Sequence, residues 1–248
     1  MRLLLINPNI SESVSELILA EAQRSAAPGT ELTMLTADAG ATHIETRMDA
    51  LLGGHAALRL AAEPGPSHDA VIVAAFGDPG LSAIRELLPV PVLGMTESAL
   101  ASASLLGHRF SIIAISQRIA AWYREVVTAC GFAGRMASLR ALDRPLSGIG
   151  SVQQEHGERL KQLCEQAVAE DGADVIVLAG APLAGLARSL RGQLPVPVVD
   201  GVSSAVCHAQ SLVQLQPGTH QRGSFALPPA KPHRGLPEAI ARLLDAPR

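Results

Sequence analysis

The sequence predicts an α/β protein made of two pseudo-symmetric lobes, each with a central parallel sheet, and a cleft between them. Short apolar runs that end in Gly, Pro, Asn or Asp alternate with stretches of helical periodicity, a pattern typical of parallel strands covered by helices. The chain also repeats itself. VIVAAFGDPGL at 71–81 matches IVLAGAPLAGL at 176–186, and LPVPVLGMTESA at 88–99 matches LPVPVVDGVSSA at 194–205. Two similar halves that face each other place matching strand ends on opposite sides of one cleft.

The elements follow from these runs in chain order. Predicted strands cover residues 3–6, 71–75, 90–93, 110–115, 175–178 and 196–199. Predicted helices cover 12–26, 47–62, 81–88, 97–106, 116–130, 152–170, 185–193, 203–215 and 236–244, with Gly131 and Gly172 as C-terminal caps. We expect lobe one to contain residues 1–97 and 200–248, and lobe two to contain residues 98–199. Residues 216–235, rich in proline and glycine, are expected to form a tail over the domain or a neighbouring subunit, or alternatively a basic flap over an anionic substrate.

Composition narrows the class of protein. Of 248 residues, 48% are hydrophobic but only 2% are aromatic, so the core is built from small aliphatic side chains. A net charge of −3 gives no basic footprint for nucleic acid. The apolar runs are too short to span a bilayer, and the N-terminus does not resemble a secretory signal. Three scattered cysteines agree with a reducing compartment. We therefore expect a cytoplasmic protein that binds neither nucleic acid nor membrane.

Polar and small residues follow several predicted strands, where α/β folds bind their ligands. Asn7 and Asn9 flank a proline at the first strand end, although such residues also serve as helix caps. Asp78 precedes Pro79 as expected for the N-cap of the next helix. Asp78 and Asp200 both stand at predicted helix starts, where the helix dipole favours the charged form of a carboxylate and makes it a poor base. The candidate substrate-binding residues at these ends are Asn7, Asn9, Phe76, Gly77, Ala181 and Gly201.

Four motifs occur in order within residues 1–215: INPN, AAFGDPGL, GMTESALASASLLGHRFSII and PVPVVDGVSSAV. Together they resemble the aspartate/glutamate racemase superfamily, in particular its hydantoin/allantoin racemase branch. The resemblance implies two pseudo-symmetric α/β lobes with the active site between them, an oligomer and no cofactor. Members of that branch invert or deprotonate a carbon next to a carbonyl. They do so with two thiols, one from each half, on opposite faces of the carbon.

The two thiol positions of that branch are substituted in this chain. Ala75 stands at the first and Gly180 at the second, while Ala114 and Ile115 replace an expected pair of threonines. The three cysteines lie in predicted helices, away from all four motifs. Since alanine and glycine cannot transfer a proton, two-thiol racemisation is excluded. The small size of both substitutes indicates a retained pocket with changed chemistry.

Few titratable side chains are candidates to replace the thiols. Glu45 with His43 is the predicted acid–base pair, in a loop that the family often brings to the mouth of the cleft. Arg118 or Tyr123 is a candidate to anchor a carboxylate or to act as an acid, and Tyr123 could instead be a packing anchor.

Three functions therefore stay open. The first is an isomerase-like or racemase-like enzyme that acts next to a carbonyl of a small hydantoin, ureide or amino-acid-like carboxylate. The second is a non-catalytic protein that binds a small ligand in the same cleft. The third is a lyase or decarboxylase, for which one-sided protonation in an apolar pocket is sufficient. In each case we expect a homo-oligomer, a small anionic or ureide-like ligand, and no cofactor or metal.

Overall fold

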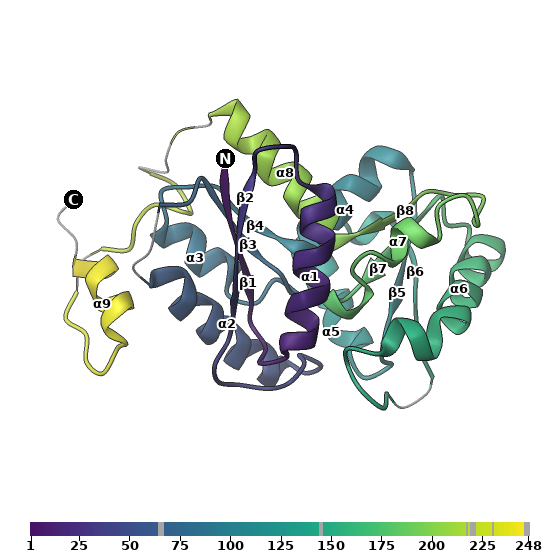
Figure 1. Cartoon of the computed structure of the whole chain (residues 1–248), viewed down its shortest axis with the longest axis horizontal. Coiled ribbons are helices and arrows are strands. Elements are labelled where there is room, and N and C mark those ends of the chain that lie inside the picture. Colours follow the sequence, from purple (N-terminus) through teal and green to yellow (C-terminus); the bar gives the residue numbers. More distant parts are fainter. Residues whose placement is uncertain (64–66, 144–145, 217, 219–221, 230, 246–248) are drawn as a thin grey trace.

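The computed structural model describes residues 1–63, 67–143, 146–216, 218, 222–229 and 231–245. It contains two four-stranded parallel sheets with the same internal order. The first runs β2 (Glu31–Thr36), β1 (Arg2–Asn7), β3 (Ala70–Val73), β4 (Val92–Gly94). The second runs β6 (Met136–Ala141), β5 (Phe110–Ala114), β7 (Val175–Ala179), β8 (Val198–Asp200). The sheets form two lobes that lie side by side, which confirms the predicted fold class (Figure 1).

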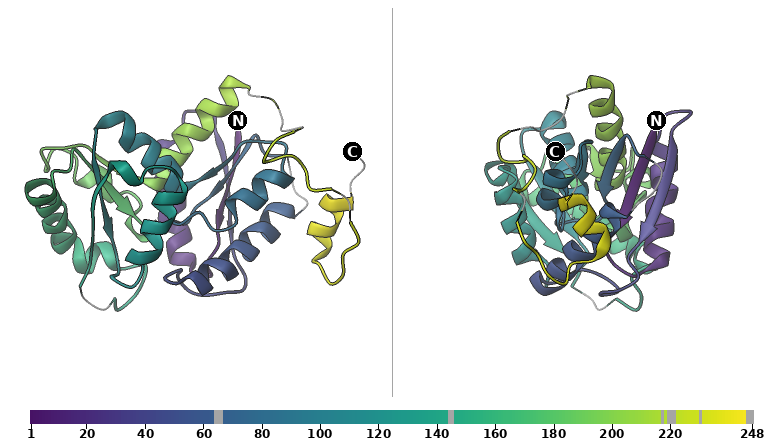
Figure 2. Two further views of the ribbon diagram at one scale, coloured as in Figure 1. Left: turned by 180° about the vertical axis from the view of Figure 1, so that it is seen from behind. Right: turned by 90° about the vertical axis from the view of Figure 1, so that its left-hand side faces the viewer.

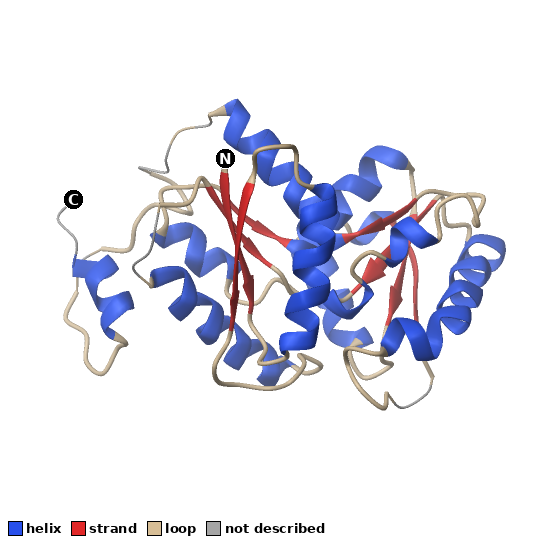
Figure 3. Cartoon of the chain, in the orientation of Figure 1, coloured by secondary structure: helices blue, strands red, loops and turns tan. Residues whose placement is uncertain are grey.

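Helices cover both faces of each sheet, which agrees with the mainly apolar character of the central strands (Figure 3). They are α1 (Glu12–Ser25), α2 (Arg47–Ala62), α3 (Leu81–Leu87), α4 (Met95–Leu106), α5 (Ala120–Ala129), α6 (Val152–Asp171), α7 (Leu186–Ser189), α8 (Gly201–Leu215) and α9 (Glu238–Asp245). Short 3-10 turns lie at Ala133–Arg135 and Ala181–Leu183. Helix α9 packs on α2, at the end of the molecule away from the second sheet (Figure 2).

The two lobes share one hydrophobic core. Alternate residues of a central strand enter different clusters: Leu3 points to the inner core and Leu4 to an outer one. Strand β7 does the same with Val177 and Leu178. The inner core joins residues of both sheets to those of α1, α4 and α8. Because each fully buried aliphatic side chain contributes about 1.5–3 kcal/mol, this shared core holds the lobes in a fixed relation.

Helices α4 and α8 carry the chain from lobe one to lobe two and back, and they pack against each other. Their first residues meet closely: a Cβ atom on Gly201 would lie 2.1 Å from Cγ of Met95. Gly201, a predicted substrate-binding residue, is thus placed in the packing between the two helices. Its lack of a side chain allows the two helix starts to approach.

Two strands, β2 and β6, were not among the predicted ones. Both are edge strands whose partly exposed faces mix polar and apolar residues, so they lack the continuous apolar run of a central strand. The predicted helix 185–193 is reduced to α7, because Gly185 and Gly192 on either side have positive φ angles of 84° and 77°. Part of the predicted tail, 216–235, lies outside the described residues. In the described part of this tail, the centre of the Phe225 ring lies 5.7 Å from the guanidinium carbon of Arg85, a residue of α3.

Candidate active site

A small cavity lies between the lobes, where the chain leaves β3 and β7. Its volume is about 30 Å³, which is room for roughly one or two waters. Its wall is mostly apolar, and the polar side chains that line it within the described residues are Asn9, His43 and Tyr123. The full lining is Asn9, His43, Ile44, Ala75, Phe76, Ile115, Ile119, Tyr123, Ile149, Gly180, Ala181 and Pro182. Both positions at which the resemblance expects a thiol therefore face one cavity.

The two substituted positions differ in their backbone. Ala75 is 5% exposed and its φ angle is not positive. Gly180 has φ +115° and ψ 139°, a region that side-chain-bearing residues rarely adopt. Two hydrogen bonds fix the segment that follows Gly180: Gln153 Nε2 donates to the carbonyl oxygens of Pro182 (2.8 Å) and Ala184 (3.0 Å). The loop of lobe two is thus held in a conformation that suits glycine.

No cysteine lines this cavity. Cys130 caps the end of α5, Cys164 is buried in α6, and Cys207 is exposed on α8. Burial raises the pKa of Cys130 to about 11 and that of Cys164 to about 12, and it also raises the pKa of Cys207. The reactive form of cysteine is the thiolate, so all three are poor nucleophiles and bases at neutral pH.

Tyr123 projects from α5 into the cavity. Its ring packs on Phe76 with centroids 4.7 Å apart, and its hydroxyl oxygen lies 4.0 Å from where a Cβ atom of residue 180 would stand. Within the described residues the hydroxyl makes no hydrogen bond. Burial, and after it the carboxylates of Asp78 and Glu45, raises the pKa of Tyr123 above its usual range. The phenol therefore stays protonated and is suited to donate a hydrogen bond or a proton.

His43 and Glu45 lie in the loop between β2 and α2. A capping box holds this loop, because the Thr46 hydroxyl accepts from the Asp49 N–H while the Asp49 carboxylate accepts from the Thr46 N–H. His43 lines the cavity, and its Nε2 lies 3.9 Å from a Glu45 oxygen. The other Glu45 oxygen accepts a hydrogen bond from the Ser116 hydroxyl of lobe two. Glu45 thus lies beside the imidazole without hydrogen-bonding to it and does not itself line the cavity, whereas the imidazole Nδ1 lies 3.2 Å from the Thr42 hydroxyl.

The asparagines after β1 divide their tasks. Asn7 is fully buried, and its Nδ2 donates to Asn9 Oδ1 (3.2 Å) and to Ser15 Oγ (2.9 Å). Asn9 Oδ1 also accepts from the Ser11 N–H at 2.9 Å. Asn7 does not line the cavity, whereas Asn9 does. The backbone N–H of Asn9 donates to Asn7 Oδ1 at 3.2 Å, but its side-chain Nδ2 donates to no acceptor in the described chain. The network therefore fixes Asn9 with free donors at the cavity wall.

Backbone N–H groups provide further donors. Those of Phe76 and Ala181, at corresponding places in the two lobes, donate to no acceptor within the residues that the structure describes. The Gly77 N–H is engaged by the Thr96 hydroxyl, and a Cβ atom on Gly77 would lie 2.2 Å from the Trp122 ring. Preorganised N–H groups of this kind stabilise negative charge that develops on a substrate oxygen.

Asp78 was expected to cap the helix that follows it and to be held in its charged form, and the structure agrees with neither expectation. Helix α3 begins at Leu81 after Gly80, and Asp78, with φ +49°, does not cap it. Its carboxylate instead accepts from the N–H groups of Thr96 (2.7 Å) and Glu97 (2.9 Å), at the start of α4. Removal from water outweighs these hydrogen bonds and raises the pKa of Asp78 to about 7. The expectation of a charge-stabilised cap for its own helix was wrong, because the fold brings a different helix start to this side chain.

Arg118, another predicted substrate-binding residue, is exposed and does not line the cavity. The apolar wall residues Ile44, Ile119, Ile149 and Pro182 were not predicted. Ile44 lies between His43 and Glu45, the two predicted acid–base residues, and its position next to them was the only feature of the sequence that indicated a place in the cavity wall. Ile149 lies in the loop before α6, where nothing in the sequence points to the cleft.

Within the described residues, no group of three or more His, Cys, Asp or Glu side chains is placed to hold a metal ion. Among the same residues, no helix has both the length and the apolar character needed to cross a membrane.

Residues 3–209 match the Asp/Glu/Hydantoin racemase family. The chain belongs to this family. It is 37% identical over 236 residues to the hydantoin racemase of Paenarthrobacter aurescens, which covers 93% of this chain and 99% of that protein. It is 31% identical over 245 residues to the hydantoin racemase of a Pseudomonas strain, NS671, covering 98% of each. The protein is therefore an enzyme of the racemase family.

Solved structures agree with this membership. The allantoin racemase of Klebsiella pneumoniae superposes with a TM-score of 0.91 at 36% identity, covering 97% of this chain and 98% of that one. The allantoin racemase of Pseudomonas fluorescens superposes with a TM-score of 0.89 at 34% identity, covering 95% and 100%. Arylmalonate decarboxylase, with a TM-score of 0.59 at 17% identity, shares the fold. This family member thus keeps the two-lobed framework while its cavity lacks sulfur.

Proposed function

We propose that this racemase-family enzyme removes and returns the proton on a carbon next to a carbonyl of a small hydantoin, ureide or amino-acid-like carboxylate. Because the cavity has a volume of only about 30 Å³ in this structure, the proposal requires it to widen when such a substrate enters. His43 of lobe one and Tyr123 of lobe two are the proposed acid–base groups. The observation that carries the proposal is that each lobe contributes one titratable side chain to the cavity between Ala75 and Gly180. Inversion of a carbon centre needs a proton to leave one face and another to arrive at the opposite face, so groups from opposite lobes suit it.

The two groups have unequal roles. The His43 side chain is 42% exposed and lies beside Glu45, so it can exchange its proton with solvent and act as the base. Tyr123 is only 2% exposed and its raised pKa keeps it protonated until it donates to the opposite face of the carbanion. The phenolate that this donation leaves must regain a proton from solvent before the next turnover, while His43 releases the proton that it took. Proton removal leaves an enolate, whose oxygen is negatively charged. The Asn9 amide and the N–H groups of Phe76 and Ala181 are the proposed donors to that oxygen.

This division of roles predicts that the substrate exchanges its proton with solvent faster than its configuration inverts. A carbanion formed by His43 is reprotonated on the same face whenever Tyr123 fails to deliver its proton first. Because a buried phenol takes up and loses protons less readily than an exposed imidazole, solvent deuterium enters the substrate faster than the configuration inverts. A symmetric pair of thiols would give no such inequality.

The test is solvent deuterium incorporation, followed by NMR, with circular dichroism of the same samples. The panel contains 5-substituted hydantoins, allantoin, amino acids and substituted malonates. General acid–base groups contribute about 10²–10⁴-fold to rate, so we expect a loss of that size in deuterium exchange for His43→Asn. Tyr123→Phe should reduce inversion by a similar factor and leave exchange largely intact. The matched control is His55→Asn, which changes an exposed histidine of α2 that does not line the cavity.

The outcomes separate the possibilities. Exchange that is unchanged in His43→Asn contradicts the role assigned to His43, and inversion that is unchanged in Tyr123→Phe contradicts the role assigned to Tyr123. If the natural protein exchanges no proton on any compound but Ala75→Cys does, the cavity accepts the family's substrates and lacks only a base. A protein that binds these compounds without exchange in either form is the non-catalytic ligand-binding protein that the sequence left open.

A second candidate reaction is loss of carbon dioxide from a substituted malonate. It is favoured by the apolar wall around Ala75, Ile115 and Gly180, which destabilises a carboxylate, and by an acid that stays protonated. Carbon dioxide release from the malonates, with one-sided protonation by Tyr123, would favour this candidate. The expectations of a homo-oligomer and of a cytoplasmic location stay predictions.

A further inference from the structure

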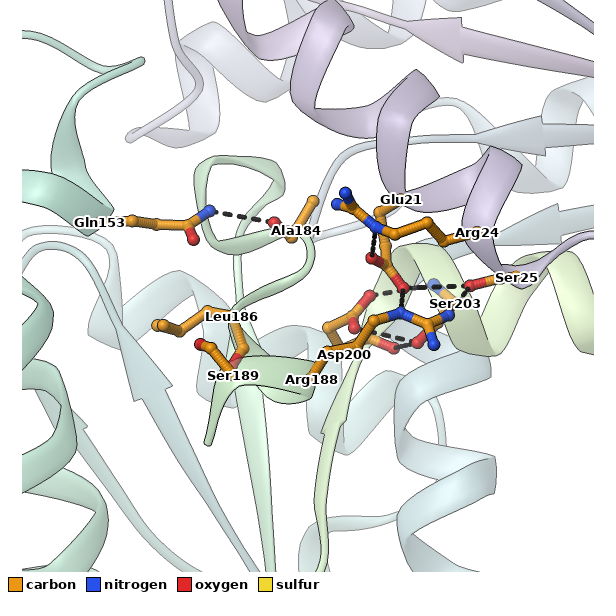
Figure 4. Close-up of polar contacts among 10 residues, drawn as sticks. All are labelled: Glu21, Arg24, Ser25, Gln153, Ala184, Leu186, Arg188, Ser189, Asp200 and Ser203. Atoms are coloured by element: carbon orange, nitrogen blue, oxygen red, sulfur yellow. Dashed lines mark hydrogen bonds and ion pairs between the residues drawn. The ribbon is translucent and has the colours of Figure 1, made fainter. Parts of the chain in front are cut away.

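A second cavity, of about 550 Å³, lies on the seam between the lobes and shares no lining residue with the candidate active site. Its wall comes from the C-terminal half of α1, from α4 and α8, and from α7 and β8 of lobe two. This volume is within the range of small-molecule sites in proteins. Unlike the candidate active site, its wall carries several charged side chains, of which Figure 4 shows Glu21, Arg24, Arg188 and Asp200.

A fully buried carboxylate lies at the centre of this wall. Glu21 of α1 accepts from Nε of Arg24 at 3.1 Å, from Nε of Arg188 at 2.7 Å and from the Ser25 hydroxyl at 3.0 Å. Arg188 belongs to α7 of lobe two, and its Nη2 also donates to Ser25 at 2.8 Å. The two guanidinium groups therefore converge from different lobes on one carboxylate (Figure 4).

Positive charge exceeds negative charge in the cavity wall. Arg24 contacts Glu21 only through Nε, so its terminal nitrogens donate to no acceptor within the described residues. The exposed guanidinium of Arg191 has no partner there either. The second carboxylate, Asp200, already accepts from the N–H and the hydroxyl of Ser203, both at 2.9 Å, and burial raises its pKa. Three arginines thus face two occupied carboxylates.

We propose that this cavity binds a small dianion, with either two carboxylates or one phosphate group. Guanidinium groups present two parallel N–H donors, a geometry that matches the oxygens of carboxylates and phosphates. Arg24 and Arg191 supply the free donors, and the Ser204 hydroxyl lies in the same wall. Such a ligand would contact both lobes at once.

The site is joined to the wall of the candidate active site through one short segment. A Cβ atom on Gly185 would lie 2.9 Å from Nη2 of Arg24 and 3.1 Å from Oε2 of Glu21. Gly185 lies two residues after the turn Ala181–Leu183, which supplies Ala181 and Pro182 to the active-site cavity. A dianion that changes the position of Arg24 therefore acts next to the loop that bears Gly180.

The experiment is calorimetric titration of the full chain at fixed ionic strength. The ligands are succinate and inorganic phosphate, with succinamide as an uncharged match for succinate. A hydrogen bond to a charged group is worth enough that its loss weakens binding about ten-fold or more. We expect saturable binding of at least one dianion and none of succinamide. Both Arg191→Gln and Arg24→Gln should weaken that binding about ten-fold, and the exposed Arg109→Gln should not.

Several results would overturn the proposal. One is the absence of saturable binding for both dianions. Another is equal weakening by Arg191→Gln and Arg109→Gln, which would indicate general attraction to a charged surface. Loss of binding in Asn9→Ala, with none in Arg191→Gln, would place the ligand in the candidate active site instead. Arg191→Gln changes an exposed side chain, so its folding is expected to be unaffected and its result interpretable.

Discussion

Replacing Gly180 by alanine should destabilise the protein although there is room for the added methyl group. A Cβ atom at this position would lie 3.6 Å from Cδ of Pro182 and 4.0 Å from the Tyr123 hydroxyl, which are ordinary contact distances. The cost lies in the backbone, because φ is +115° and ψ is 139°. A residue with a side chain pays about 1–3 kcal/mol in such a region.

A matched substitution isolates that backbone term. Gly157 lies in the interior of α6, with no positive φ and with nothing within 4 Å of an added Cβ atom. Gly157→Ala is the same chemical change on a helical backbone and should stabilise by about 0.5–1 kcal/mol. In urea unfolding we therefore expect the free energies of unfolding of the two variants to differ by about 1.5–4 kcal/mol, with opposite signs relative to the natural protein.

The comparison also bears on the missing thiol. If Gly180→Ala is destabilised, Gly180→Cys carries the same penalty, while Ala75→Cys does not, since Ala75 has no positive φ. Equal stability of Gly180→Ala and Gly157→Ala would refute the reasoning. It would show that residue 180 can change to a negative φ at no cost, although Gln153 holds the segment after it through two hydrogen bonds.

Three further predictions concern charge and sulfur. Since the folded pKa of Asp78 is about 7, above its unfolded value of about 3.9, the folded state holds the extra proton and its stability falls as pH rises from about 4 to 7. The free energy of unfolding should change by at most about 1.4 kcal/mol per pH unit because of this group. Urea unfolding across that pH range should show a weaker pH dependence for Asp78→Asn than for the natural protein. Equal pH dependence in the two proteins would contradict the burial of the Asp78 carboxyl group. Arg188→Gln leaves the buried Glu21 with one cationic partner and should lower the free energy of unfolding by about 2 kcal/mol. Arg47→Gln, in an exposed pair with Glu125, should lower it far less, because water screens that pair; equal losses in chemical denaturation would contradict a stabilising role for the Arg188–Glu21 ion pair between the lobes. Alkylation with iodoacetamide at pH 7.5 should modify the exposed Cys207 before the buried Cys164 and leave proton exchange intact; inactivation that persists in Cys207→Ser would mean that a thiol takes part after all.

The sequence predicted the central strands because burial on both faces leaves a continuous apolar run. Strands β1, β3, β5 and β7 are of this kind, and their predicted positions agree with the structure to within a few residues. The edge strands β2 and β6 escaped prediction since one side of each is partly exposed, which interrupts the run. The other two edge strands, β4 and β8, were predicted because their short apolar runs are not interrupted by polar residues, so the interruption of the run, and not edge position alone, decides whether the sequence indicates a strand.

The candidate site was predictable only as far as chain neighbours carry information. Placing His43 and Tyr123 near the cleft needed strand order and the resemblance alone. Asp78 needed more: its sequence neighbours favoured a cap for α3, but its carboxylate binds the start of α4, 18 residues later. The second cavity is formed by contacts between distant residues, such as the ion pair of Arg188 with Glu21, which are 167 residues apart. No local sequence pattern predicts such a contact.

The framework of the site does not depend on sulfur, which explains how both thiols can be absent from a member of this family. Asn9 is held by Asn7 and its neighbours, and the wall of lobe two is held by Gln153. None of these contacts involves residue 75 or 180. The fold therefore does not require the thiols, and a cysteine at position 180 would carry the backbone cost of about 1–3 kcal/mol that its φ and ψ angles impose. The chemistry of such a cavity then rests on the titratable side chains that still reach it, His43 and Tyr123.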